Sequence, residues 1–101
     1  MTVTAPLERG GLEVRLDTTR RGPVAISLQP DAAAREHLTG ISATLSSEAA
    51  GIARLPVDLF PHEGIWTSAN VIVPVPAEWT LSIVVDDGTS PVVTAVRYVV
   101  W

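Results

Sequence analysis

The fold is decided by residues 71–85, which read V-I-V-P-V-P-A-E-W-T-L-S-I-V-V. β-Branched residues dominate this stretch, and such residues favour strands. Proline cannot donate a hydrogen bond to a strand ladder, so Pro74 and Pro76 must lie at a sheet edge or between two strands. Beyond them the apolar residues fall on one parity: Trp79, Leu81, Ile83 and Val85. We therefore predict a short strand over 71–73, a crossover, and a new strand from Trp79, whose large indole lies at the centre of the core.

The same alternation recurs along the chain at intervals of about a dozen residues, which is typical of an all-β sandwich. It marks strands over Leu12 to Leu16, Val24 to Leu28, Ile41 to Leu45, Leu55 to Leu59, Ile65 to Ala69, and Val92 to Val100. Turn residues separate these strands, and Asp87-Gly88 after the strand from Trp79 indicates a hairpin. The pattern predicts an immunoglobulin-like β-sandwich of about seven antiparallel strands.

One segment has helical character instead. Asp31 precedes an alanine-rich run and is a candidate N-cap, and Gly40 is placed to end the turn, so we expect one short helix near 31–38. The length of 101 residues is that of one domain. We therefore predict a single sandwich domain over 1–101, with room for a loose N-terminal segment at 1–10.

Charge and hydropathy exclude several classes of protein. Eleven acidic residues face seven basic ones, a net charge of −4, and every basic residue is arginine. No basic stripe is present, because the only adjacent pair is Arg20-Arg21, so nucleic acid is not an expected partner. Apolar runs fall far short of the roughly 20 residues that cross a bilayer, so this segment is not expected to insert into a membrane. Cysteine is absent, which excludes disulfides and thiolate metal sites.

No catalytic constellation is visible, and we predict that the domain is not an enzyme. The serines lack a nucleophile-elbow motif, and the acidic turn at 86–88 lacks the spacing of a calcium loop. The two histidines, His37 and His62, each adjoin a glutamate. His62 with Glu63, and then His37, are the metal-ligand candidates, but no third ligand lies at a typical spacing. Solvated loop histidines are the competing interpretation.

The aromatic residues offer one candidate partner surface. Of five aromatics, Trp79 and Tyr98 fall on core parities, which leaves Phe60, Trp66 and Trp101. Trp66 lies close to the turn at His62-Glu63, and it is the residue around which we expect a partner to bind. Packing at the rim of the core is the alternative for each of the three.

Several strand motifs together resemble a known family. They are G-I-S-A-T-L at 40–45, L-P-V-D-L at 55–59, G-I-W-T at 64–67 and V-P-V-P-A-E-W-T-L at 73–81. Over roughly residues 11–100 the chain resembles the extracytoplasmic, YtkA-like C-terminal domain of bacterial copper-transport proteins of the copper-resistance D family. One departure is Ala77, which stands where that family has glycine before the x-Trp pair. No copper ligand of the family carries over to this chain.

The resemblance implies a non-catalytic, periplasmic or cell-surface domain that takes part in copper uptake or resistance. Its partner would be a copper-transport membrane protein or the chain's own transmembrane region. It would act by docking to that partner or by weak copper binding, and copper is the only cofactor implied. Two alternatives remain open: a structural or interaction module with no metal role, and a carbohydrate-binding module that uses Trp66.

Overall fold

A computed structural model describes residues 1–7, 10–36, 38–68, 71–86, 88 and 91–101. These residues form one short helix, α1 (Ala32–Arg35), and eleven strands. The strands are β1 (Thr2–Pro6), β2 (Gly11–Leu16), β3 (Gly22–Val24), β4 (Ile26–Pro30), β5 (Gly40–Ser47), β6 (Ile52–Val57), β7 (Leu59–His62), β8 (Ile65–Ser68), β9 (Val71–Val73), β10 (Ala77–Asp86) and β11 (Pro91–Val100). The predicted all-β class is confirmed.

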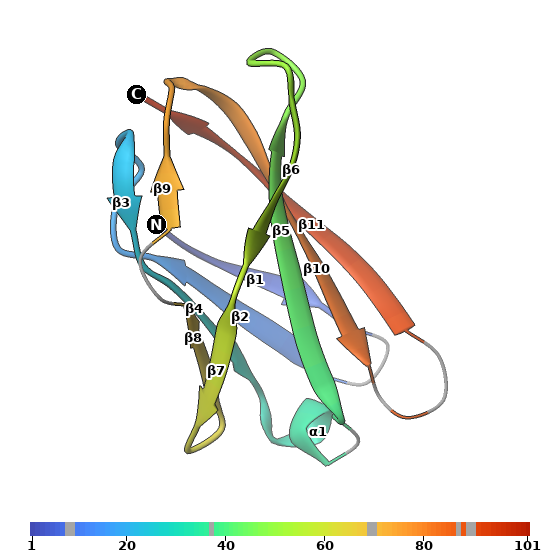
Figure 1. Cartoon of the computed structure of the whole chain (residues 1–101). Helices are drawn as coiled ribbons and strands as arrows, with labels where there is room; N and C mark the ends of the chain where they lie inside the picture. The colour runs from blue at the N-terminus through green and yellow to red at the C-terminus, as the bar shows by residue number, and fades with distance from the viewer. Residues whose placement is uncertain (8–9, 37, 69–70, 87, 89–90) are drawn as a thin grey trace.

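Two antiparallel sheets face each other and form the sandwich (Figure 1). One sheet has five strands in the order β1-β2-β4-β8-β7, and the other has four strands in the order β11-β10-β5-β6. A two-stranded sheet of β3 and β9 lies at one end, near both chain termini. Inward-facing apolar side chains from both larger sheets make one continuous core between the layers.

Trp79 lies in the core, as its parity predicts. Its side chain is fully buried, as are Leu81 and Ile83 on the same strand, while the residues between them face outward. Alternation on β2, β4 and β5 supplies the opposing apolar side chains. A period of two therefore suffices to place the core of this domain.

The proline pair acts as the sequence predicts. β9 ends at Val73, residues 74–76 form no strand, and β10 begins at Ala77. β9 pairs with β3, whereas β10 pairs with β5 and β11. The two prolines thus mark the point at which the chain leaves one sheet and enters another.

The structure has more strands than the predicted seven, in part because two predicted strands are each divided between sheets and because β1 was not predicted. The strand predicted over Val24 to Leu28 breaks at Ala25, so that β3 pairs with β9 and β4 pairs with β2. The strand predicted over Leu55 to Leu59 breaks at Asp58, so that β6 joins the four-stranded sheet and β7 the five-stranded one. Alternation continues across both breaks, which is why it conceals them.

The N-terminal residues are also ordered more than the sequence indicates. Residues 2–6 form β1, which pairs with β2 at the edge of the five-stranded sheet instead of forming a loose segment. The helix is present but shorter than expected, and Gly40 lies in β5 and does not end it. Asp31 is the N-cap as predicted, because its carboxylate accepts a 2.9 Å hydrogen bond from the backbone N–H of Ala34.

Candidate functional site

The hairpin of β7 and β8 carries the residues that sequence reasoning selected. Glu63 and Gly64 connect the two strands, with φ angles of 52° and 81°. Positive φ at both positions is the requirement of a type I′ turn, whose twist matches that of the flanking strands. The side chain of Arg35, from α1, lies against Gly64, where a Cβ atom would come within 2.8 Å of Nη1. The turn therefore has a defined shape and a contact with α1.

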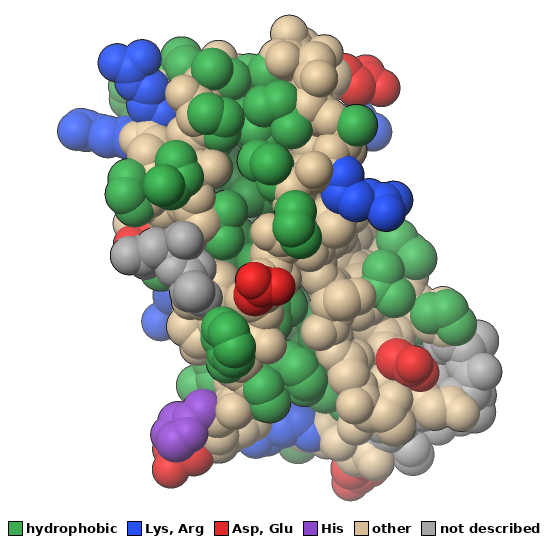
Figure 2. Space-filling model, in the orientation of Figure 1, with side chains coloured by type: hydrophobic (Ala, Val, Ile, Leu, Met, Phe, Trp, Pro, Cys, Tyr) green, Lys and Arg blue, Asp and Glu red, His purple; other side chains and the backbone are tan. Residues whose placement is uncertain are grey.

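His62 and Glu63 lie at the exposed tip of this hairpin. The His62 Nε2 and Glu63 Oε1 atoms are 4.0 Å apart, and the two side chains are 85% and 84% exposed. Figure 2 shows the histidine projecting from the body of the molecule with an acidic side chain beside it. Within the described ranges no three histidine, cysteine or acidic side chains gather where they could hold a metal ion. His37, the second candidate, lies outside the described residues.

The outer face of the five-stranded sheet continues from this hairpin toward β4 and β2. Phe60 lies opposite Thr67, and His62 lies opposite Ile65, so that all four side chains are on the outward side of the sheet. Phe60 is 59% exposed and Ile65 is 36% exposed. An exposed aromatic ring and an exposed branched aliphatic chain thus occupy diagonal positions on neighbouring strands, on a sheet face whose other side chains are mainly polar.

Polar side chains of β2 and β4 complete this surface. The Arg15 guanidinium donates a 3.0 Å hydrogen bond to the Glu13 carboxylate. Two shallow hollows of about 250 and 90 Å³ lie on this side of the sheet, and Glu13 and Gln29 line both. The outward side chains of β2, β4, β8 and β7 in this region are called the Phe60 face. They are Glu13, Arg15, Ser27, Gln29, Phe60, His62, Ile65 and Thr67.

Trp66, the residue expected to mark the partner surface, lies differently. It alternates with the exposed Ile65 and Thr67, so it faces inward and packs in part against the core. Phe60 is the exposed aromatic near the hairpin instead. The sequence alone did not decide this, because Ile65 and Thr67 share one parity while Trp66 and Ser68 share the other, and each set has one apolar and one polar residue.

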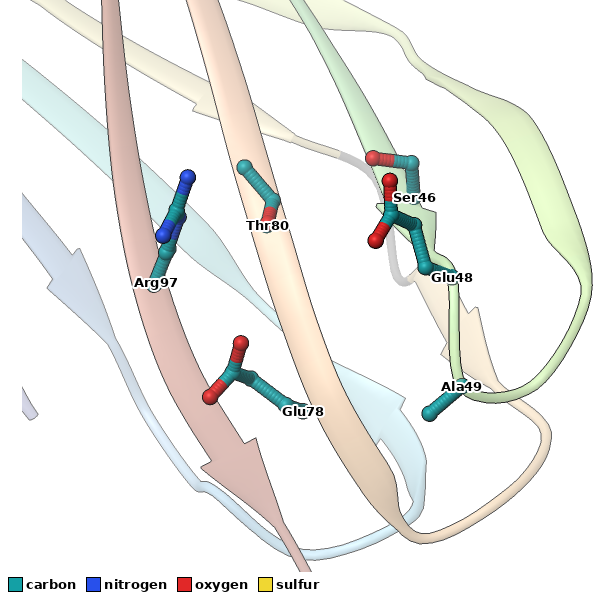
Figure 3. Close-up of a pocket in the computed structure, with 6 residues that line it drawn as sticks. All are labelled: Ser46, Glu48, Ala49, Glu78, Thr80 and Arg97. Atoms are coloured by element: carbon teal, nitrogen blue, oxygen red, sulfur yellow. The ribbon is translucent and has the colours of Figure 1, made fainter.

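A larger hollow, of about 330 Å³, lies on the outer face of the four-stranded sheet (Figure 3). Arg97 of β11 and Glu78 of β10 approach it from neighbouring strands, and Glu48 approaches from the turn after β5. Across the described residues no ion pair joins Arg97 to either carboxylate. The hollow has charges of both signs and the hydroxyls of Ser46 and Thr80, but no histidine lines it to act as a base for either hydroxyl.

One buried titratable group lies in the core. The Tyr98 hydroxyl, on β11 opposite Trp79, is buried and has no hydrogen-bond partner among the described residues. Burial removes water that would stabilise the phenolate, and this raises the pKa of Tyr98 to about 12. The side chain is therefore neutral at physiological pH and lines none of the three hollows, so no chemical role follows for it.

Comparisons with known proteins identify no relative. No family model matches the chain, and searches of curated proteins and of solved structures find no match either. None of the helices in the described residues has the length and apolar character needed to cross a membrane. The candidate site must therefore be interpreted from its own geometry.

Proposed function

We propose that this domain is a non-catalytic docking module and that the Phe60 face binds its partner. The observation that carries the proposal is the exposure of Phe60 and Ile65 next to hydrogen-bonding side chains on one sheet face. Protein interfaces combine such groups, with an aromatic anchor at the centre and polar contacts at the rim.

The chemistry of the face indicates what it would bind. Phe60 and Ile65 offer apolar contact, Gln29 offers both a donor and an acceptor, and the Arg15–Glu13 pair offers charges of both signs. A protein surface that presents an apolar side chain flanked by polar groups fits this arrangement. A polysaccharide is less suited, because the face has a single aromatic ring on which a sugar could stack.

The place of action and the partner are proposed on the sequence resemblance. It supports an extracytoplasmic domain that docks to a copper-transport membrane protein or to its own transmembrane region. A direct role in copper binding is a weaker part of the proposal, because His62 and Glu63 provide two ligands at most. One imidazole and one carboxylate include no soft sulfur donor and leave coordination positions open, so His62 would act as one ligand of a site completed by the partner.

Photo-crosslinking from single positions tests the docking proposal. A photoreactive phenylalanine is placed at Phe60 and, in a control, at Ile72, which is 64% exposed but lies on β9. In intact cells we expect position 60, and not position 72, to crosslink to a copper-transport membrane protein. Equal crosslinking from both positions, or none from position 60, would overturn the proposal.

Copper titration tests the metal role separately. Cu(I) and Cu(II) are titrated into the isolated domain and into His62→Ala, with Glu48→Gln as a control that removes a carboxylate on the outer side of the other sheet. We expect affinity no tighter than micromolar, lost in His62→Ala and kept in the control. Tight binding that survives His62→Ala would place copper elsewhere, whereas no binding at all would leave docking as the function.

A further inference from the structure

β11 forms an edge of the four-stranded sheet. It spans ten residues, and among the described residues β10 is the one strand that pairs with it (Figure 1). We propose that two copies of this chain pair through this edge, as antiparallel β11 strands, and join their four-stranded sheets into one continuous sheet.

The orientation of the backbone supports an open edge. Just past β11, the backbone N–H of Trp101 donates a hydrogen bond to the carbonyl of Thr19, and the carbonyl of Trp101 accepts one from the N–H of Arg21. Both groups of Trp101 point to the side away from β10. Alternate residues of an extended chain direct their N–H and C=O groups to the same side. Counting back from Trp101, the groups that point away from β10 belong to Val99, Arg97, Ala95 and Val93. No backbone partner is recorded for these four groups within the described ranges.

The other edge strands of the two larger sheets are shorter than β11 and carry prolines near their ends. β1, β6 and β7 have 5, 6 and 4 residues, and each carries a proline at or next to its last position: Pro6, Pro56 and Pro61. Short, proline-bearing edges resist pairing with a further strand. β11 instead has its proline at the first position, followed by an uninterrupted run from Val92 to Val100. The exposed side chains Val93 and Val99 are 68% and 62% exposed, which an unpartnered edge strand does not normally retain.

The sequence of β11 is complementary to itself in one register. Pairing Val93 with Val99 of the second copy also pairs Ala95 with Arg97, and all four open residues then find a partner. A shift of two residues one way places Arg97 opposite Arg97, which is repulsive. A shift the other way places Val99 opposite Pro91, which has no N–H to donate. Thr19 and Arg21 block extension of the pairing beyond Val100, because they already bond Trp101.

This register makes a prediction whose sign depends on charge. By symmetry, Ala95 of each copy lies opposite Arg97 of the other copy, so the dimer contains this pair twice. Ala95→Glu therefore creates two attractive cross-strand pairs, and Ala95→Lys creates two repulsive ones. Both side chains are exposed. We expect the dimer dissociation constant to fall roughly three- to tenfold in the first variant and to rise by a similar factor in the second.

Analytical ultracentrifugation of the whole chain measures these constants. Ser82 lies directly opposite Ala95 on β10, one strand inward from the edge, so Ser82→Glu and Ser82→Lys are matched controls that should leave dimerisation nearly unchanged. We expect the wild-type chain to dimerise with a constant on the order of 10–100 µM, given the small interface. A chain that stays monomeric up to about 1 mM, or shifts of equal sign in Ala95→Glu and Ala95→Lys, would overturn the proposal.

A measurement on the wild-type chain keeps the test independent of the variants. Amide hydrogen exchange at Val93, Ala95, Arg97 and Val99 should slow as the protein concentration rises, because these N–H groups become bonded only in the dimer. Exchange at Val96, which points to β10, should not depend on concentration. Concentration-independent exchange at all five positions would contradict the proposed pairing. The Phe60 face lies on the other sheet, so dimerisation and docking can succeed or fail separately.

Discussion

The indole Nε1 of Trp79 donates a 3.1 Å hydrogen bond to the backbone carbonyl of Val75. Val75 stands between the two prolines that separate β9 from β10. Proline at 76 holds Val75 in an extended conformation, outside any strand ladder, so its carbonyl is free to accept from a side chain. The interruption of the strand and the burial of the indole are therefore linked. The crossover between β9 and β10 supplies the carbonyl that hydrogen-bonds the indole N–H, the one polar group of the Trp79 side chain.

Replacing Trp79 with phenylalanine should destabilise the domain strongly. The variant loses the hydrogen bond to Val75 and leaves a void among fully buried neighbours. We expect the free energy of unfolding to fall by about 2–3 kcal/mol in urea titrations. Trp101→Phe is the control, because Trp101 is 74% exposed, and it should change stability by no more than about 0.5 kcal/mol. Equal effects of the two substitutions would contradict the placement of Trp79.

Asp31 should contribute more to stability than its exposed position indicates. Its carboxylate accepts hydrogen bonds from the N–H of Ala34, at 2.9 Å, and from the N–H of Gly11, at 2.8 Å. It thus caps α1 and ties that helix to β2. We expect Asp31→Ala to lower the free energy of unfolding by about 1–2 kcal/mol. Asp58→Ala, which removes an exposed carboxylate between β6 and β7, should have little effect in the same assay.

Gly64 should be sensitive to substitution because of its backbone conformation. Its φ of 81° is strained for any residue with a side chain, and a Cβ atom would also displace Arg35. We expect Gly64→Ala to cost about 1–2 kcal/mol and to weaken partner binding by disturbing the hairpin that carries Phe60. Gly40 is a matched control, since it has ordinary φ and open space around it. If thermal unfolding shows Gly40→Ala to be the more damaging change, the turn geometry is wrong.

Stability should fall in strongly alkaline solution because of Tyr98. Its pKa is about 12 in the folded domain, and an unfolded tyrosine titrates near 10. Above pH 10 the unfolded chain releases this proton while the folded chain keeps it, so the free energy of unfolding falls as pH rises from about 10 to 12. The loss from this group should reach about 1–3 kcal/mol by pH 12.

Tyr98→Phe separates this effect from general alkaline denaturation. The variant has no phenol to ionise, so its stability should decline less between pH 10 and pH 12 than that of the wild-type domain. At neutral pH it should be as stable as wild type or slightly more stable, because the lost hydroxyl has no partner among the described residues. Parallel pH profiles of unfolding free energy for the two proteins would show that Tyr98 is accessible to water.

Much of the fold follows from alternation in the sequence. The parity of Trp79, Leu81 and Ile83 predicts the core correctly, and the two prolines predict the crossover. The breaks at Ala25 and Asp58 were not predicted, because a strand that changes sheets keeps its inward side chains inward. β3 also pairs with β9, far away along the chain, and local sequence holds no record of such a partner.

The candidate site was predicted only in part. His62 and Glu63 lie at a hairpin tip, as turn residues indicate, but burial decides which aromatic is exposed. Pro61 lies opposite Trp66, so Phe60 and Trp66 face opposite sides of the sheet, and the burial of Ser68 shows that Trp66 is on the inward side. The polar side chains of β2 and β4 join the face through sheet order, which only the tertiary structure reveals.

The central claim, that the Phe60 face docks a partner, is tested most directly by isoleucine methyl NMR. The labelled domain is titrated with the proposed partner, a copper-transport membrane protein held in lipid nanodiscs. The account predicts that the methyl signal of Ile65, on the Phe60 face, broadens and shifts while that of the more exposed Ile72 stays unchanged. Perturbation of Ile72 with no change at Ile65, or no perturbation of either, would contradict it.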